Sequence, residues 1–191
     1  ILLRQGRIGP GHAIEATLRS IPMWNCREWG FAVMGPSEPV YARSLVQLAE
    51  VLGVNAQFAI LPLVSYDKLP HDTPGAHVGH ALYQPIHINH LYPTTASNKI
   101  MEYMAAGLPL LVSDRPGLRA LVDKYTGGLT ADESSPVSIA AAVNTLVGDP
   151  DLARKMGAAG AKAFQEEFNY ERQFAPVLAA FRSLCITPGR N

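Results

Sequence analysis

The sequence predicts an α/β protein in which a doubly wound parallel sheet is followed by a helical C-terminal tail. Short apolar runs rich in β-branched residues alternate with amphipathic helical patterns over the first two thirds of the chain. Strands that are separated by single helices cannot form hairpins, so they pair in parallel through right-handed crossovers. The last third carries only helical patterns. We therefore expect one doubly wound domain over residues 1–191, with the C-terminal helices at 150–185.

Six segments are expected to form the strands of this sheet. Each is an apolar run bounded by turn residues, and the sixth is weaker than the others. The expected strands are Ile1–Gln5, Trp29–Met34, Ala56–Leu61, Val78–Tyr83, Leu108–Ser113 and a short run around Leu129.

Helical patterns occupy the intervals and the tail. Apolar residues recur at helical spacing in two early segments, Ile14–Ile21 and Tyr41–Leu52. In the tail, Ser135 before Pro136 and Asp149 before Pro150 combine a capping side chain with proline at the first helical position. Asn169 opens a last helix, and its apolar stripe is expected to face inward: Phe174, Val177, Leu178, Phe181 and Leu184.

The composition excludes several classes of protein. The 191 residues include 16 basic and 16 acidic ones, so a protein that binds nucleic acid by neutralising many phosphates is not expected. No run of about 20 uncharged apolar residues is present to span a membrane. Cys26 and Cys185 are too few for a disulfide framework, which indicates a cytoplasmic protein; a peripheral position at the inner face of the membrane is left open. The abrupt apolar start at Ile1 suggests a chain cut from a longer one.

The turn after the first expected strand is a candidate ligand site, because ligands bind beyond the carboxyl ends of strands in open parallel sheets. It reads GRIGPGH and runs from Gly6 to His12. Its glycines would let the backbone approach a ligand, and Arg7 would offer positive charge to a phosphate. The spacing is not the dinucleotide G-x-G-x-x-G pattern, so glycines required only by a tight turn remain an equal alternative.

The segment SNKIMEYMAAGLP, which starts at Ser97, is a second candidate site. Ser97 can cap a helix that ends at Gly107. Lys99 and Glu102 are three residues apart and share a face near the start of that helix. Lys99 and the cap amides suit a diphosphate, and Glu102 can accept two hydrogen bonds from the hydroxyls of a ribose. On these residues alone, a surface Lys–Glu pair is the more common explanation.

Longer stretches of the chain resemble a known family. They are SNKIMEYMAAGLPLLVSDRPGLRALV, GGLTADESSPVSIAAAVNTLVGDPDLARKMGAAG and FNYERQF, together with QGRIGPGHAIEATL and FAVMGP. Over essentially the full length, the chain resembles the C-terminal, donor-binding domain of family 4 glycosyltransferases, which have the GT-B fold. The resemblance implies a single Rossmann-like, nucleotide-sugar-binding domain over residues 1–191, with the N-terminal acceptor domain absent from this chain.

The resemblance also implies roles for individual residues. It makes Glu102 the carboxylate that binds the ribose and Arg7 the arginine that binds the diphosphate. His12 stands where the family usually has a lysine that makes the second phosphate contact. Thr94 stands where the family commonly has a glutamate that touches the donor sugar.

One branch of the family has a Ser-Asn-Lys segment at the start of the corresponding helix. The resemblance to this branch places Ser97, Asn98 and Lys99 in the donor site, where Lys99 would supply the charge that His12 does not. In the family, the loop after the third strand holds the nucleotide base mostly through backbone groups. Here that loop is Leu61 to Val64, so side chains do not reveal which base is bound.

The resemblance implies a retaining, metal-independent glycosyltransferase of the hexosyltransferase type. Its substrates would be a nucleoside diphosphate sugar and an unknown glycan or lipid-linked acceptor, with no cofactor, in synthesis of bacterial surface polysaccharide or glycolipid. This domain would hold the diphosphate, with Arg7 and Lys99 stabilising charge on the leaving group. The acceptor site and any general base would belong to the N-terminal domain, so the chain alone is expected to be inactive.

Two other functions remain open. A noncatalytic glycosyltransferase-like domain that binds a nucleotide or a partner protein is favoured by Thr94 and His12. Retention of Arg7, Lys99 and Glu102 argues against it. A nucleotide-sugar epimerase would need acidic residues and histidines placed for proton abstraction, and the long segment before Glu102 carries no acidic residue.

Five of the six histidines fall close together, and two pairs of them have the H-x-x-H spacing of metal ligands. They are His71, His77, His80, His87 and His90. His77 and His80 fall on an expected strand, where an odd separation points their side chains to opposite faces. The other pair lacks a nearby Cys, Asp or Glu, so we expect no metal site. We expect His87, Asn89 or His90 to line the donor-sugar pocket, although exposed loop histidines are the common alternative.

Overall fold

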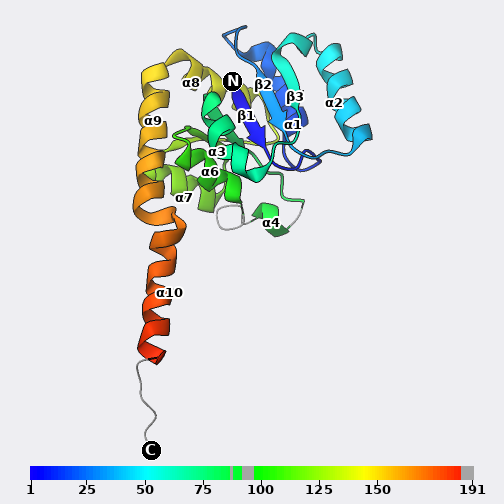
Figure 1. Ribbon diagram of the computed structural model, residues 1–191. Coiled ribbons are helices and arrows are strands. Elements are labelled where there is room, and N and C mark those ends of the chain that lie inside the picture. The colour runs from blue at the N-terminus through cyan, green and yellow to red at the C-terminus, as the bar shows by residue number, and fades with distance from the viewer. Residues whose placement is uncertain (87, 92–96, 186–191) are drawn as a thin grey trace, which may run out of the picture.

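A six-stranded, all-parallel sheet forms the centre of the computed structural model, which describes residues 1–86, 88–91 and 97–185 (Figure 1). The strands are β1 (Leu2–Gln5), β2 (Phe31–Met34), β3 (Phe58–Leu61), β4 (Val78–Ala81), β5 (Leu110–Ser113) and β6 (Gly128–Ala131). Their order is β3-β2-β1-β4-β5-β6, so the winding reverses between β1 and β4. This is the predicted doubly wound fold, and the reversal places a crevice at the carboxyl ends of these two strands.

The strands are shorter than the apolar runs that predict them. The fourth run continues through Leu82 and Tyr83, which are buried although β4 ends at Ala81. The fifth begins at Leu108, which is also buried, two residues before β5. Burial therefore extends beyond the hydrogen-bonded ladder at several ends, and hydrophobicity alone does not mark where the ladder stops.

Helices cover both faces of the sheet. They are α1 (Ile14–Ser20), α2 (Pro39–Val51), α3 (Leu69–Asp72), α4 (Ile88–Leu91), α6 (Asn98–Ala105), α7 (Pro116–Tyr125), α8 (Pro136–Gly148), α9 (Pro150–Ala163) and α10 (Tyr170–Cys185). Because successive side chains of a strand point to opposite faces, Leu2 packs with the cluster of α1, α2 and α8, and Leu3 packs with that of α6 and α7. The predicted caps of the tail are confirmed: the side chains of Ser135 and Asp149 accept hydrogen bonds from backbone amides of α8 and α9.

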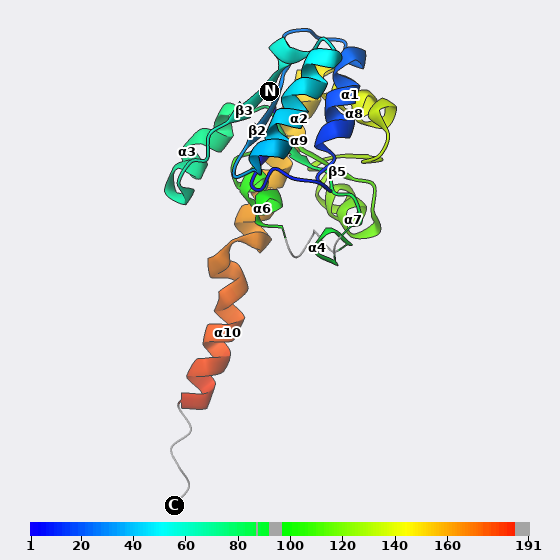
Figure 2. The ribbon, with the colours of Figure 1, turned by 90° about the vertical axis from the view of Figure 1, so that its right-hand side faces the viewer.

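Helix α10 projects away from the rest of the molecule (Figures 1 and 2). The prediction that its apolar stripe faces inward is wrong for the described structure, because all five residues of the stripe are exposed. Phe181 is 59% exposed and Leu184 is 74% exposed. Helical periodicity shows that such a stripe exists, but it does not show what the stripe packs against.

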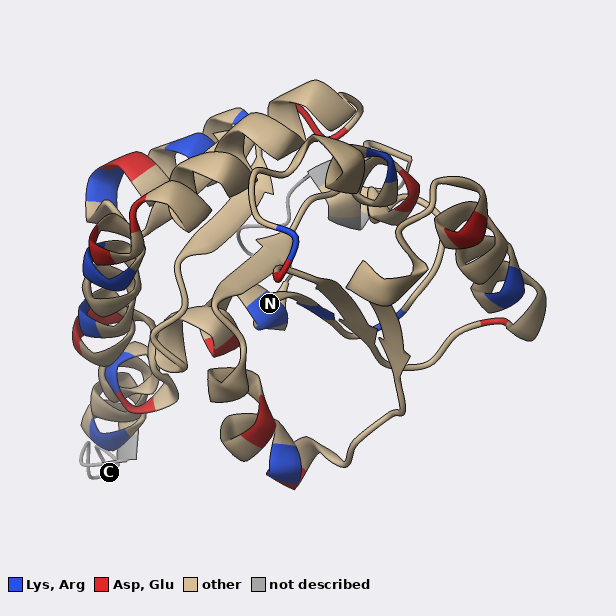
Figure 3. Ribbon diagram, turned by 90° about the horizontal axis from the view of Figure 1, so that it is seen from above, with Lys and Arg blue, Asp and Glu red and all other residues tan. Residues whose placement is uncertain are grey.

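The surface carries both signs of charge. Figure 3 shows basic and acidic residues alternating along the helices on the face seen from above, in keeping with the neutral sum of charges. Within the described ranges, no helix has the length and apolarity needed to cross a bilayer.

The turns that follow β1 and β2 lie against each other. The backbone amide of Gly6 donates to Met34 O at 2.9 Å, and the amide of Ile8 donates to Pro36 O at the same distance. Gly35 has φ +144°, and a Cβ atom at this position would lie 2.2 Å from Gly6 O. Only glycine fits such an approach, so Gly35 fixes the position of the turn that leads from β1 toward the crevice.

Candidate functional site

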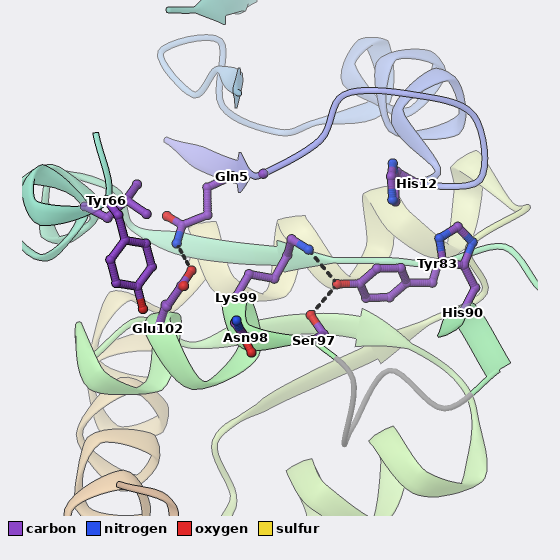
Figure 4. A pocket seen from close by; sticks show the side chains of 11 residues that line it. Gln5, His12, Tyr66, Tyr83, His90, Ser97, Asn98, Lys99 and Glu102 are labelled. Atoms are coloured by element: carbon purple, nitrogen blue, oxygen red, sulfur yellow. Dashed lines mark hydrogen bonds between the residues drawn. The ribbon is translucent and has the colours of Figure 1, made fainter. Parts of the chain in front are cut away.

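A cavity of about 360 Å³ lies at the carboxyl end of β1 and the start of α6 (Figure 4). This is the edge of the sheet at which the order of strands predicts a ligand site. Eleven residues from loops and helices far apart in sequence line it: Gln5, Gly6, His12, Tyr66, Leu69, Tyr83, His90, Ser97, Asn98, Lys99 and Glu102.

The carboxylate of Glu102 is held at one end of the cavity by a chain of polar side chains. Gln5 Nε2 donates to Glu102 Oε2 at 2.5 Å, and Thr73 Oγ1 donates to Gln5 Oε1 at 2.9 Å. Gln5 and Thr73 are almost completely buried, whereas Glu102 is half-buried. The chain fixes one carboxylate oxygen and leaves the group facing the cavity, where it can accept further hydrogen bonds from a ligand.

Beneath this end, the hydroxyl of Tyr103 joins β1 to α6. The backbone amide of Gln5 donates to it at 2.8 Å, and the hydroxyl donates to Leu3 O at 3.0 Å. Tyr103 has no exposed surface, and burial raises the pKa of its phenol far above the usual value. A neutral phenol is the form that can donate and accept at once, so the residue ties the helix that bears Glu102 to the strand that bears Gln5.

We expect Tyr103→Phe to lower the free energy of unfolding by about 1–3 kcal/mol, because it leaves the buried amide of Gln5 without its acceptor. Denaturant unfolding of the two proteins measures this difference. Tyr170→Phe is the matched control, since Tyr170 is 71% exposed and its substitution is expected to change stability by less than about 0.5 kcal/mol. Equal unfolding midpoints for wild type and Tyr103→Phe would contradict this role.

Lys99 lies in the middle of the cavity. Its Nζ donates to the hydroxyl of Tyr83 at 3.0 Å, and that hydroxyl lies 2.6 Å from Ser97 Oγ. Burial lowers the pKa of Lys99 below its usual value. Ser97 occupies the predicted N-cap position of α6, but its side chain bonds to Tyr83 and makes no capping hydrogen bond, which corrects the predicted cap. The hydroxyl of Tyr83, which is itself paired with Ser97, instead holds the ammonium group of Lys99 near the N-terminus of α6.

His12 and His90 form the other end of the cavity, next to each other and to the ring of Tyr83 (Figure 4). Their ring centroids are 5.0 Å apart. His12 Nδ1 lies 3.1 Å from Gly9 O, and a carbonyl only accepts, so Nδ1 carries the proton. Burial is the main cause that lowers the pKa of His12 to about 3, followed by the positive charges of Arg4 and Lys99. The imidazole is therefore neutral near pH 7 in the free protein.

Gly11 joins the turn after β1 to the segment that carries His90. It adopts φ +84°, and a Cβ atom here would lie 2.4 Å from the side chain of Ile86. Its carbonyl accepts a hydrogen bond from the amide of Gln84 at 2.8 Å. This close approach brings His12 and His90 together although they are far apart in the sequence.

Arg4 is a buried cation that sequence reasoning missed. It has no exposed surface, and none of its three guanidinium nitrogens finds a hydrogen-bond partner within the described chain. Its Cζ lies 5.5 Å from the centroid of the Tyr83 ring, behind the cavity. A charged residue inside the apolar run of the first strand is the signal that could have drawn attention to it.

The structure brings most of the predicted site residues together. His12, Ser97, Asn98, Lys99 and Glu102 all line the cavity. Four further lining residues were not predicted from the sequence: Gln5, Tyr66, Leu69 and Tyr83. Their signal is weak, because each has a common role in a core or loop and only the fold places it beside the others.

Several other expectations fall elsewhere. Arg7 belongs to the same turn but is exposed and is not among the residues that line the cavity. The loop 61–64 likewise does not line the cavity; the lining residues from this part of the chain are Tyr66 and Leu69, a few positions further along the sequence. His90 lines the cavity, whereas His87 and Thr94 lie outside the described residues, as does the side chain of Asn89.

His77 and His80 occupy different environments, as predicted, although His77 precedes β4 by one residue and only His80 lies on the strand. His77 is exposed and contacts the ring of Trp29. His80 is fully buried, with its Nε2 2.9 Å from Thr17 Oγ1. The two imidazoles do not converge on one ligand position.

A larger and more apolar cavity of about 760 Å³ adjoins the first one beyond Glu102. The two share Tyr66, Leu69, Asn98 and Glu102. The remainder of the larger cavity is lined mainly by apolar groups of α6 and of the segment that leads into α10. The site as a whole thus runs from an apolar end, past a carboxylate and a lysine, to a pair of histidines.

Comparison with known proteins identifies what the chain resembles. A family model described as glycosyl transferase-like matches residues 16–179. The alpha-maltose-1-phosphate synthase of Mycolicibacterium smegmatis is 31% identical over 104 residues, which are 54% of this chain and 26% of that protein.

Solved structures share the fold. Sucrose-phosphate synthase from Thermosynechococcus elongatus superposes with a TM-score of 0.75 at 19% identity, over 96% of this chain and 45% of that one. Anabaena Alr3699/HepE, solved in complex with UDP and glucose, superposes with a TM-score of 0.74 at 14% identity, over 94% of this chain and 48% of that one. The chain spans less than half the length of these relatives.

Proposed function

The chain belongs to the glycosyl transferase-like family, and on this premise we propose that it is the donor-binding half of a retaining, metal-independent glycosyltransferase. Its donor is a nucleoside diphosphate sugar. One observation carries the proposal: Lys99 and Glu102, one turn apart on α6, face the same cavity at the crevice of a doubly wound sheet.

The nucleoside is proposed to lie at the Glu102 end. A carboxylate that is fixed on one side by Gln5 still has lone pairs for the two hydroxyls of a ribose. The cavity beyond Glu102 becomes apolar and includes the ring of Tyr66, which suits a planar base. Anabaena Alr3699/HepE, which has the same fold, was solved with UDP, and this supports a nucleotide in the crevice.

The diphosphate is proposed to lie over Lys99, in the middle of the cavity. Lys99 is half-buried and is held by a tyrosine hydroxyl, so its charge acts in a medium of lower dielectric than water. As the bond between sugar and phosphate breaks, negative charge develops on the leaving diphosphate, and a fixed cation there stabilises it. Arg7 joins this role if its side chain turns from solvent toward the ligand.

The sugar is then proposed to lie beyond the diphosphate, at the end of the cavity that carries His90. The acceptor would approach from the open side of the crevice. We propose that an N-terminal domain binds it, since this chain spans less than half the length of its relatives. No side chain of the described residues is assigned as a general base.

Titration of the chain with UDP, GDP and their sugar conjugates tests donor binding. We expect binding of at least one nucleotide below millimolar concentration. For the transferase activity, the whole protein is tested for release of nucleoside diphosphate in the presence of acceptor. Binding without release across a broad panel of donors and acceptors would favour the noncatalytic alternative, and no binding at all would remove the proposal.

A further inference from the structure

His12 presents a single free nitrogen to the cavity. Its Nδ1 carries a proton and is bonded to Gly9 O, so only Nε2 is left to meet a ligand. In the neutral ring, Nε2 carries a lone pair and no proton. A lone pair repels the oxygens of a phosphate, whereas the N–H of an imidazolium would attract them.

The charges around His12 are almost all positive. Arg4 lies behind it on β1, and Lys99 faces it from α6. From the other packed segments come Tyr83, after β4, and His90, on α4, which also acts to lower the pKa of His12. His80 of β4 is fully buried, and burial lowers its pKa well below the usual value. Among the described residues that line the cavity, Glu102 is the one carboxylate, and it stands at the opposite end (Figure 4).

In the free protein, the positive charge around His12 is not balanced by nearby negative charge from the described residues. Arg4 is a fully buried charge that lies against the Tyr83 ring and forms no ion pair within the described residues, and a buried cation without an anion is costly. The same two cations disfavour a third positive charge on His12. An anion bound between Lys99 and His12 would relieve both effects at once.

We propose that His12 takes up a proton when the donor binds, so that the diphosphate is held by an imidazolium that exists only in the complex. The inference rests on the proposed function and adds a step to it. The proton comes from solvent and is added to Nε2, while Nδ1 keeps its bond to Gly9. Two phosphate charges close to Lys99 and Arg4 offset the repulsion that keeps His12 neutral in the free protein. The cation is present when the leaving diphosphate gains charge, and it is absent from the free protein.

The sign of the pH dependence follows from proton uptake. Since the complex binds more protons than the free protein, the affinity for the donor falls as the pH rises between the two pKa values of His12. The lower value, in the free site, is about 3. Between this value and that of the complex, the affinity falls by about tenfold per pH unit, and it becomes constant above the value of the complex.

Calorimetric titration of the chain with UDP-glucose, and with GDP-mannose as a second probe, tests the proposal. Measuring the heat in two buffers of different ionisation enthalpy gives the number of protons taken up. A sugar conjugate is used because a free terminal phosphate itself gains a proton near pH 6. At about pH 6 we expect more than about half a proton to be taken up per donor bound.

Variants assign the proton to His12. His12→Gln is expected to bind on the order of tenfold more weakly at about pH 6 and to take up no proton. His12→Arg, with a permanent cation, is expected to bind without uptake. His71→Gln, at an exposed histidine of α3, should keep the uptake. NMR of the ring nitrogens in the wild-type protein needs no variant: the Nε2 signal should change from that of a neutral ring to that of an imidazolium on donor binding.

The outcomes separate this inference from the proposed function. If neither nucleotide sugar binds, the proposed function fails and the inference fails with it. Binding without proton uptake, or with uptake that survives in His12→Gln, overturns the inference alone. A neutral His12 ring signal in the saturated complex overturns it as well.

Discussion

Replacing Glu102 by alanine is expected to weaken the binding of a nucleoside diphosphate by roughly ten- to a hundredfold. The substitution removes a carboxylate that is fixed by Gln5 and faces the cavity, and a hydrogen bond to a charged group contributes about 1.5–3 kcal/mol. The loss should be similar for UDP and for its sugar conjugates, because the proposed contact is to the ribose that they share.

Titration of the purified variants measures this effect. Glu171→Ala is the matched control, since Glu171 is an exposed carboxylate on α10 outside both cavities. Its affinity should equal that of the wild type. Unfolding of Glu102→Ala should be followed in parallel, because Gln5 loses its acceptor. Unchanged nucleotide affinity in a folded Glu102→Ala protein would show that the ribose is held elsewhere.

The largest effect on stability is expected for Gly35→Ala, with a loss of at least about 3 kcal/mol in the free energy of unfolding. The new methyl group would lie 2.2 Å from the backbone oxygen of Gly6, a residue whose amide is hydrogen-bonded to Met34 in the turn after β1. The clash is with backbone, so no side chain can rotate away, and φ +144° adds strain for any residue with a Cβ atom.

Thermal or denaturant unfolding measures this loss. Gly148→Ala is the matched control, because a Cβ atom there would meet no atom within 4 Å and the residue ends helix α8. We expect it to unfold within about 0.5 kcal/mol of the wild type. If Gly35→Ala proves as stable as Gly148→Ala, the turns after β1 and β2 do not lie as close together as described.

The sequence was sufficient to predict the fold because its signals are local. Apolar runs alternate with helical patterns, and proline after Ser135 and after Asp149 marks two helix starts that the structure confirms. The apolar face of α10 was misplaced for a physical reason. Amphipathic spacing is a property of the helix alone, whereas burial requires a partner surface, and the described part of the chain places none against this stripe.

The candidate site was predictable only in part. Lys99 and Glu102 could be paired from their spacing on one helix, and both line the cavity. The roles of Gln5 and Tyr83 could not be predicted, because they depend on contacts that the fold makes between distant segments. Nor could the sequence show that Arg4 is buried without a hydrogen-bond partner in the described chain or that His12 is neutral, since both depend on burial and on the charges nearby.

The central claim is that a nucleotide-sugar donor occupies the cavity between Glu102 and His12, and a crystal structure of the chain with UDP-glucose or GDP-mannose tests it most directly. We expect ribose hydroxyls within hydrogen-bond distance of the Glu102 carboxylate, a phosphate oxygen at Lys99 Nζ and another at His12 Nε2. A donor bound outside this cavity, or one that leaves Glu102 and Lys99 untouched, would contradict the claim.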